Sequence, residues 1–167
     1  QSLVVSIPSP DDPLGTGGAP TGLVFNIASG QGAFMIKGVS SAGIPNSAPA
    51  IFLFAAEDGT ILGWNPAVNP PKFDPAKAGR YAIIAVDNSP SGAIYKGLAI
   101  AIAGGPPRLY ATNFHAGTVE VYDASFNPAN GLPADAFVDP RLPRGYAPFN
   151  VVPITVMNTT ELFVTYA

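Results

Sequence analysis

The stretch that decides the fold is Leu53-Phe-Ala-Ala-Glu-Asp-Gly-Thr-Ile-Leu-Gly-Trp-Asn65, and its pattern returns twice along the chain. It returns in Leu109-Tyr-Ala-Thr-Asn-Phe-His-Ala-Gly-Thr-Val-Glu-Val-Tyr-Asp123 and, in part, in Leu162-Phe-Val-Thr-Tyr-Ala167. Each full copy is a short apolar strand, a Gly-Thr turn and a second strand with alternating side chains, which is the pattern of a β-hairpin. Repeats spaced by about fifty residues are typical of radial or stacked β-architecture.

The segments between the copies repeat as well. Strands that begin Gly22-Leu23-Val24 and Gly97-Leu98-Ala99 precede the two full hairpins, and apolar runs at Leu3 to Ile7 and Ala82 to Val86 precede those strands. Four strands per cycle is the number in a β-propeller blade. We therefore predict an all-β fold, a β-propeller fragment of about two to three four-stranded antiparallel blades. A β-sandwich is the alternative, because its turns come at similar intervals.

The repeat predicts where each blade begins and ends. Residues 1–19 are expected to form an edge strand and loop of a preceding blade, 20–87 the first blade, 88–139 the second and 140–167 an incomplete third. Since the third hairpin stops after one strand, we expect the remaining polypeptide of the same propeller, or a second copy, to complete the sheet. The sequence pattern predicts no helix. Its period-2 alternation predicts strands at Ser2–Ile7, Gly22–Ile27, Ala33–Lys37, Ala50–Ala56, Thr60–Trp64, Tyr81–Val86, Tyr95–Ile102, Arg108–Thr112, Thr118–Tyr122, Phe137–Val138, Phe149–Val152 and Leu162–Tyr166.

Composition supports a folded β-domain and excludes several partners. The 167 residues are 47% hydrophobic, with a mean hydropathy of +0.27, only 11% charged, and contain 18 Gly and 19 Pro, which favour turns over helices. A net charge of -3 gives no basic surface for nucleic acid. No run of 18 apolar residues is present, so no membrane span is expected. Because the chain has no Cys, the sequence does not indicate whether the protein works in an oxidising or a reducing compartment.

The same composition favours a secreted or cell-surface location. Low charge and high Gly and Pro content are commoner in secreted proteins, and Asn158-Thr159-Thr160 is an acceptor sequence for N-glycosylation in a eukaryotic source. This sequence falls where a hairpin turn is expected, so Asn158 would be exposed. Because the chain starts at Gln1 without an initiator Met or a signal peptide, we expect it to have been cut from a longer precursor.

Longer phrases resemble an uncharacterised family of secreted β-propellers, some of whose bacterial members carry a PEP-CTERM sorting tail. The family is similar in blade pattern to NHL and YWTD propellers, so the resemblance implies six blades, and this chain matches the middle portion of its members. No activity is implied. The phrases that carry the resemblance are Phe54-Ala-Ala-Glu-Asp-Gly-Thr-Ile-Leu-Gly-Trp-Asn-Pro66, Val86-Asp-Asn-Ser89, Tyr95-Lys-Gly-Leu-Ala99, Leu109-Tyr-Ala-Thr-Asn113, Gly117-Thr-Val-Glu-Val-Tyr-Asp123 and Asp139-Pro-Arg-Leu-Pro-Arg-Gly-Tyr-Ala-Pro-Phe-Asn150.

Polar residues at strand ends are the candidate ligand-binding residues. Asp87, Asn88 and Ser89 end an apolar strand, and their oxygens would suit a hard cation such as Ca²⁺, although a capped turn around Asp87 is the alternative. Tyr95 and Lys96 begin the next strand, of the type that lines a propeller channel. No cofactor is evident, and the metal ligands stay undefined.

The first turn of the repeat and the equivalent second turn hold the other candidates. Asn113 and His115 lie in the second turn, and His115 is the only His, so a His-pair zinc site is excluded. A lone His in a turn is more often solvated than catalytic. The Asp58-Gly59 pair is typical of a type I′ hairpin turn, which gives Asp58 a structural interpretation. No catalytic residue is assigned.

Three functions remain open. The first is a binding or interaction module, with carbohydrate as one ligand class. The second is a propeller enzyme, of the lactonase or glycan-cleaving kind, with a cation in the central channel. The third is a structural coat protein without ligand. An apolar channel would favour the first, and a ring of Asp, Asn or Glu around a cation the second.

Overall fold

The computed structural model describes residues 3–102, 105–133, 135–157 and 159–167, and its regular elements are β-strands joined by turns. The strands are β1 (Pro20–Phe25), β2 (Met35–Val39), β3 (Pro45–Pro49), β4 (Phe52–Ala56), β5 (Thr60–Trp64), β6 (Ile83–Asp87), β7 (Tyr95–Ala101), β8 (Arg108–Asn113), β9 (Thr118–Tyr122), β10 (Pro148–Val156) and β11 (Thr159–Tyr166). Three short 3₁₀ turns, η1 (Ser29–Gln31), η2 (Pro75–Lys77) and η3 (Ser89–Ser91), are the helical elements of the described residues. The expected all-β class is confirmed.

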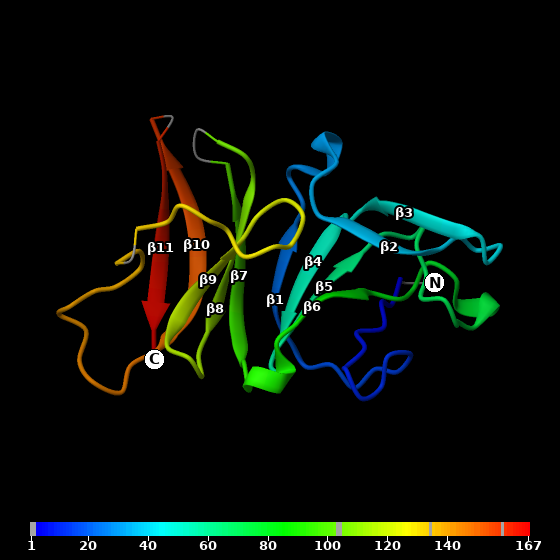
Figure 1. Ribbon diagram of the computed structural model, residues 1–167, viewed down its shortest axis with the longest axis horizontal. Coiled ribbons are helices and arrows are strands. Elements are labelled where there is room, and N and C mark those ends of the chain that lie inside the picture. Colours follow the sequence, from blue (N-terminus) through cyan, green and yellow to red (C-terminus); the bar gives the residue numbers. More distant parts are fainter. Residues whose placement is uncertain (1–2, 103–104, 134, 158) are drawn as a thin grey trace.

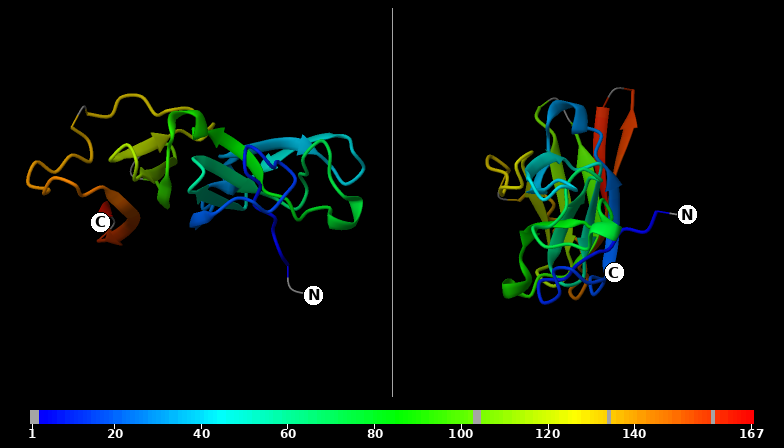
Figure 2. Two further views of the ribbon diagram at one scale, coloured as in Figure 1. Left: turned by 90° about the horizontal axis from the view of Figure 1, so that it is seen from below. Right: turned by 90° about the vertical axis from the view of Figure 1, so that its right-hand side faces the viewer.

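The strands form several small antiparallel sheets. The first sheet has the order β1-β4-β5-β6, the second β7-β8-β9, and the third is the hairpin β10-β11, while β2 and β3 form a separate hairpin. These three main sheets stand side by side, with the β2–β3 hairpin extending beside the first (Figure 1). A view turned by 90° shows the sheets in succession from β10–β11 to the N-terminal half (Figure 2).

The first strand of each main sheet carries the same irregularity. The pairing register shifts between Pro20 and Gly22 in β1, between Tyr95 and Gly97 in β7, and between Pro148 and Asn150 in β10. Such β-bulges bend a strand and increase its local twist. Gly22, Gly97 and Asn150 therefore occupy equivalent positions, and this explains why two of the repeated strands begin with Gly.

These bulges are the places where neighbouring sheets approach most closely. A Cβ atom on Gly22 would lie 2.9 Å from Leu98 Cβ, and one on Gly97 would lie 2.7 Å from Asn150 Cα. Real Cβ atoms do not approach other carbon atoms so closely, so glycine is needed where β1 meets β7 and where β7 meets β10. The two interfaces between successive sheets are thus built in the same way.

Apolar side chains fill the space between the sheets. Between the first and second sheets lie Leu53, Ile61, Leu98 and Leu109, all buried. A smaller cluster, which includes Tyr110, Val121 and Val151, joins the second sheet to the third. A third cluster lies on the far side of the first sheet, around Ile7, Leu62 and Trp64.

Some sequence expectations differ from the structure. The expected strand at Ser2–Ile7 is absent from the described part of this segment, where only Ser6 forms an isolated bridge with Tyr81, and Phe137–Val138 is a turn. The run Ala82–Val86 precedes the second Gly-Leu strand in the repeat, but its strand β6 pairs with β5 at the outer edge of the first sheet, inside the span 20–87 expected for the first blade. β3 was not expected, because Pro45 and Pro49 bound it.

The β4–β5 turn differs in type from the expectation. Gly59 has a φ of 83°, but Asp58 is not among the residues with positive φ, so this is not a type I′ turn. Gly59 N–H donates to Ala56 O at 3.2 Å, which matches a three-residue hairpin with Gly in the left-handed position. The structural interpretation of Asp58 agrees with its contacts, since its Oδ1 accepts hydrogen bonds from Thr60 N and Oγ1 at 3.1 and 2.6 Å.

Candidate functional site

Two features of the structure bear on function: a partly buried polar cluster at one end of the second sheet and an apolar groove along the first strands. The cluster joins the turn after β6 to strands β7 and β9. Glu120 Oε2 accepts hydrogen bonds from the hydroxyls of Tyr95 at 2.5 Å and Tyr122 at 2.6 Å. Asn88 Nδ2 donates to the same two hydroxyls at 2.7 and 2.8 Å. The two hydroxyls lie 3.0 Å apart.

Burial decides the chemistry of the two tyrosines. Tyr95 is fully buried and Tyr122 is 4% exposed. Burial raises the pKa of both phenols far above the usual range, and the hydrogen bond that each donates to Glu120 raises it further, because the anion would lose that bond. Both phenols are therefore neutral donors at physiological pH. In this state they bind the Glu120 carboxylate and connect the elements around it.

Asn113 ties the β8–β9 turn to the same carboxylate. Its Nδ2 donates to Glu120 Oε1 at 2.7 Å, and its Oδ1 accepts from Ala116 N at 3.1 Å and Ile94 N at 3.3 Å. Asn113 thus uses its amide donor on the cluster and its amide oxygen on backbone groups. Of the sequence-predicted residues, the structure brings together Asn88, Tyr95 and Asn113.

Asp87 and Ser89 lie beside this cluster but form a turn of their own. Asp87 is exposed, and its Oδ1 accepts from Ser89 N at 3.0 Å and Ser89 Oγ at 2.6 Å. This is the capped turn that the sequence offered as the alternative to a cation site. His115 is exposed in the β8–β9 turn, close to Gly92 of the η3 turn.

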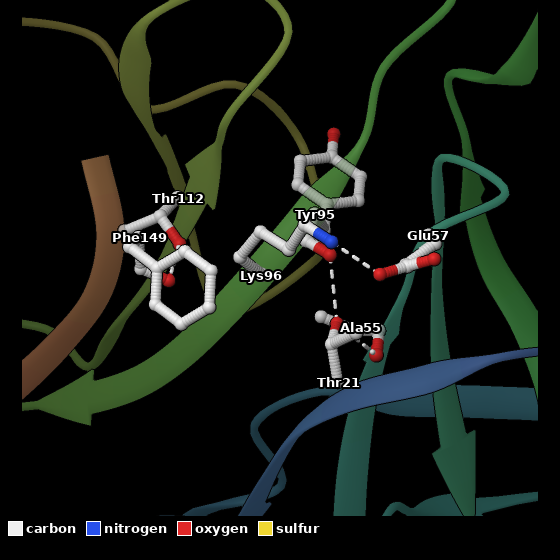
Figure 3. A network of polar contacts seen from close by, with 7 residues as sticks. All are labelled: Thr21, Ala55, Glu57, Tyr95, Lys96, Thr112 and Phe149. Atoms are coloured by element: carbon white, nitrogen blue, oxygen red, sulfur yellow. Dashed lines mark hydrogen bonds and ion pairs between the residues drawn. The ribbon is translucent and has the colours of Figure 1, made fainter. Parts of the chain in front are cut away.

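Lys96 belongs to the contact between the first two sheets. Its Nζ forms an ion pair with Glu57, from the β4–β5 turn (Figure 3). Beside it, Thr21 Oγ1 donates to Tyr95 O at 2.7 Å and lies 3.3 Å from Ala55 O. At the next interface, Thr112 Oγ1 donates to Phe149 O at 3.0 Å (Figure 3). These polar contacts hold the sheets in register.

The second feature is a groove that runs across the first strands of the three main sheets, with a volume of about 520 Å³. Consecutive residues of a strand point to opposite faces, so a surface that includes a whole run of them presents the strand's edge. Among the residues that the structure describes, β1, β7 and β10 each pair on one side only, so the other edge of each strand carries no strand partner there. None of the lining residues is charged: Thr21, Gly22, Leu23, Val24, Phe25, Ile27, Leu98, Ala99, Ile100, Asn150, Val151, Val152 and Pro153.

Several apolar side chains of the groove are open to solvent. Leu23 is 61% exposed, Phe25 55%, Ile27 57% and Val152 44%. Phe25 also contacts the ring of Phe52 edge to face, with centroids 5.6 Å apart, which fixes its orientation. The groove thus combines exposed apolar side chains, among them the oriented ring of Phe25, with the backbone N–H and C=O groups of the strand edges.

Sequence reasoning missed Glu120, the residue on which the polar cluster is centred. A signal was present, because Glu120 and Tyr122 are two apart on a strand and so share a face. What the sequence lacks is the placement of β9 against the turn that holds Asn88, 32 residues earlier. For the groove, the sequence predicted only the type of strand that lines it and not the groove itself.

Other expectations concern a metal, glycosylation and the membrane. Within the described ranges, no group of three His, Cys, Asp or Glu side chains could hold a metal ion. Asn158 lies outside the described residues. No helix among the described residues is long and apolar enough to cross a membrane.

Comparisons with known proteins give one distant relative. The chain is 32% identical over 121 residues to an uncharacterised protein, R640, of Acanthamoeba polyphaga mimivirus. The match covers 71% of this chain but only 19% of the viral protein, so the chain spans about a fifth of that relative's length. No family model and no solved structure matches the chain.

Proposed function

We propose that this chain is part of a secreted or cell-surface β-propeller that works as a binding module. The propeller assignment rests on the succession of three sheets, each beginning with a bulged strand and each packing on the next. A sandwich would pack two sheets face to face and would not need one interface to recur. Six blades, NHL-like repeats and the blade division at 20–87, 88–139 and 140–167 are part of the same proposal.

The observation that carries the binding function is the groove along β1, β7 and β10. These strands would line the central channel of a propeller, and their exposed side chains are apolar. An apolar channel is the property that favours a binding module over a channel-cation enzyme. Asp87, Asn88, Ser89, Asn113 and His115 lie at or near one end of the second sheet, where they would belong to the rim of the groove's mouth.

Carbohydrate is the ligand class that we propose for the groove. A sugar ring has an apolar C–H face that can stack on an aromatic ring such as Phe25, and hydroxyls that can bond the free N–H and C=O groups of the strand edges. Pockets that bind small molecules generally combine an apolar lining with a few polar groups in this manner. The amide of Asn150 would supply a side-chain hydrogen bond at one end.

The proposal is tested with a glycan array followed by calorimetry on the best glycan. We expect saturable binding that Phe25→Ala weakens about tenfold or more, which corresponds to about 1.4 kcal/mol. The matched control is Ile44→Ala, because Ile44 is 64% exposed but lies outside the groove. Absence of glycan binding, or equal affinity in Phe25→Ala, would refute the carbohydrate proposal.

The same experiment separates the alternatives. Calorimetry with Ca²⁺ and release of reducing sugar from the bound glycan would together support an enzyme with a channel cation. No response to glycan or to Ca²⁺ would leave the structural coat protein. Glycan binding without turnover is the outcome that the binding module requires.

A further inference from the structure

Asn130 and Gly131 form an exposed bend between two residues that the fold holds in place. Ala129 N–H donates to Val121 O at 2.8 Å. Ala129 and Leu132, both partly buried, pack against the apolar cluster that joins the second sheet to the third. Asn130 and Gly131 themselves are exposed. The bend therefore lies in water, while the residues on either side of it belong to an interface between sheets.

Asn130-Gly131 is the only Asn-Gly pair in the sequence. Among the described residues, neither the side-chain amide of Asn130 nor the N–H of Gly131 has a hydrogen-bond partner. Gly131 has a φ of 78°, and a Cβ atom added to it would meet nothing within 4 Å. Because glycine has no Cβ, its nitrogen can approach the side chain of the preceding residue without steric hindrance.

The two Asn-Ser pairs of the chain are bound where Asn130 is not. Asn46, which precedes Ser47, donates from Nδ2 to Ala67 O at 2.7 Å. Asn88, which precedes Ser89, donates from Nδ2 to two buried tyrosine hydroxyls at 2.7 and 2.8 Å. Each of these amides would have to give up its hydrogen bonds before it could turn toward the backbone.

The Asp58-Gly59 pair is bound as well. Asp58 Oδ1 accepts hydrogen bonds from Thr60 N and Oγ1, and Gly59 N–H donates to Ala56 O at 3.2 Å. The carboxyl group and the glycine nitrogen are thus both engaged within the turn. Asn130-Gly131 is therefore the pair of this kind whose reacting groups the structure leaves exposed and unbound among the described residues.

We propose that Asn130 is a site of spontaneous deamidation and that its main product weakens the interface between the second and third sheets. Asparagine is among the thermally labile residues. Base removes the proton of Gly131 N, which attacks Asn130 Cγ; the N–Cγ bond forms, the Cγ–Nδ2 bond breaks, and ammonia leaves with a proton from water. Water then opens the resulting succinimide. Opening at Cγ gives aspartate, and opening at the main-chain carbonyl carbon gives isoaspartate.

The isoaspartate product changes the backbone and not only the charge. Its main chain runs through Cβ and Cγ, so one extra carbon atom lies between Ala129 and Leu132. Both residues pack against the cluster between the sheets, and closely packed interiors transmit such a displacement. We therefore expect the lengthened bend to displace at least one of them. This effect is separate from ligand binding, because neither Asn130 nor Gly131 lines the groove.

Peptide mapping by tandem mass spectrometry tests the site. The folded chain is incubated at neutral and at mildly alkaline pH, and we expect the amide-to-acid mass change at Asn130, faster at the higher pH because base starts the reaction. Asn130→Gln should stay unmodified, since its longer side chain would have to close a larger ring. In urea, Asn46 and Asn88 should react as well. An unmodified Asn130, or reaction of Asn46 or Asn88 in the folded chain as fast as that of Asn130, would overturn the proposal.

Urea titration tests the effect on the interface. The isoaspartate form, separated by chromatography, should unfold at a lower urea concentration than the fresh chain. Asn130→Asp carries the new charge on a normal backbone and should match the fresh chain, while Asn130→Gln should keep its midpoint on ageing. An isoaspartate form as stable as the fresh chain, or an Asn130→Asp variant already as unstable as the isoaspartate form, would contradict the backbone argument.

Discussion

At the residue scale, Glu120 organises the part of the second sheet that the sequence marked as a candidate site. Its carboxylate accepts hydrogen bonds from two buried phenols and from the amide of Asn113. Bonds to a charged group contribute more than neutral ones, and a buried partner left unpaired costs about 1–3 kcal/mol. The cluster is thus a set of hydrogen bonds that connects the turn around η3 to β7 and β9 and stabilises this end of the sheet.

The first prediction concerns Glu120→Gln. The amide removes the charge and replaces one acceptor oxygen by a donor, so it cannot satisfy Tyr95, Tyr122 and Asn113 together. We expect the free energy of unfolding to fall by about 2–3 kcal/mol in urea titrations. Glu57→Gln is the control, because Glu57 forms only an exposed ion pair, whose loss costs about 0–1 kcal/mol. Equal losses in the two variants would show that the cluster does not stabilise the fold.

The second prediction follows from the raised pKa values of Tyr95 and Tyr122. An unfolded tyrosine ionises with a pKa of about 10, whereas these phenols stay neutral in the folded chain. Their contribution is fully present below that pKa and is lost as pH rises above it, at up to about 1.4 kcal/mol per pH unit for each tyrosine. We expect Tyr95→Phe to flatten this alkaline decline in the free energy of unfolding.

Tyr146→Phe provides the comparison for the alkaline experiment, since Tyr146 is 54% exposed. Because this substitution removes no buried phenol, the variant should show the same alkaline decline as the wild type. Absorbance at the tyrosinate band gives an independent measurement, in which Tyr95 and Tyr122 should ionise only on unfolding. Ionisation of all tyrosines before unfolding would contradict the burial argument.

Residue patterns could identify only part of this cluster. Asn88, Tyr95 and Asn113 stood out because they border strands and turns, which local sequence reveals. Glu120 did not, since its role depends on contacts with residues far from it in sequence. Asp87 shows the converse error, in which residue type suggests a site that the fold does not form. The oxygen-bearing side chains at Asp87 and its neighbours suggest a cation site, yet the contacts of Asp87 are those of a local turn. Sequence finds the residue types, but the fold decides which of them meet.

At the element scale, the bulged first strands determine how sheets follow one another. Gly97→Ala tests this, because the added Cβ would lie 2.5 Å from Asn150 Oδ1 and 2.7 Å from Asn150 Cα. The strands would have to separate, and we expect a loss of about 1–3 kcal/mol in the free energy of unfolding. Gly30→Ala is the control, since nothing lies within 4 Å of its added Cβ and its φ is not in the left-handed region. A neutral Gly97→Ala would contradict close packing of β7 on β10.

Strand prediction succeeded where alternation and a glycine turn coincide. The expected bounds of Thr60–Trp64 and Thr118–Tyr122 are those of β5 and β9, because a Gly before each strand fixes its start. The sequence does not predict β3, because Pro45–Pro49 has few apolar residues and proline is unusual in strands. Pairing partners are harder to predict, since β1 pairs with β4 and not with β2, the next strand in sequence.

At the scale of the whole molecule, the two recurring interfaces link the stability of successive sheets. In stacked repeats, stability is approximately the sum of the stability of each unit and of the interfaces between neighbouring units. Gly22→Ala tests the first interface, because the added Cβ would lie 2.9 Å from both Leu98 Cβ and Leu98 N. We expect the free energy of unfolding to fall by about 1–3 kcal/mol in urea titrations, since β1 and β7 would have to separate. A Gly22→Ala variant as stable as the wild type would mean that the packing of β1 on β7 does not support the fold.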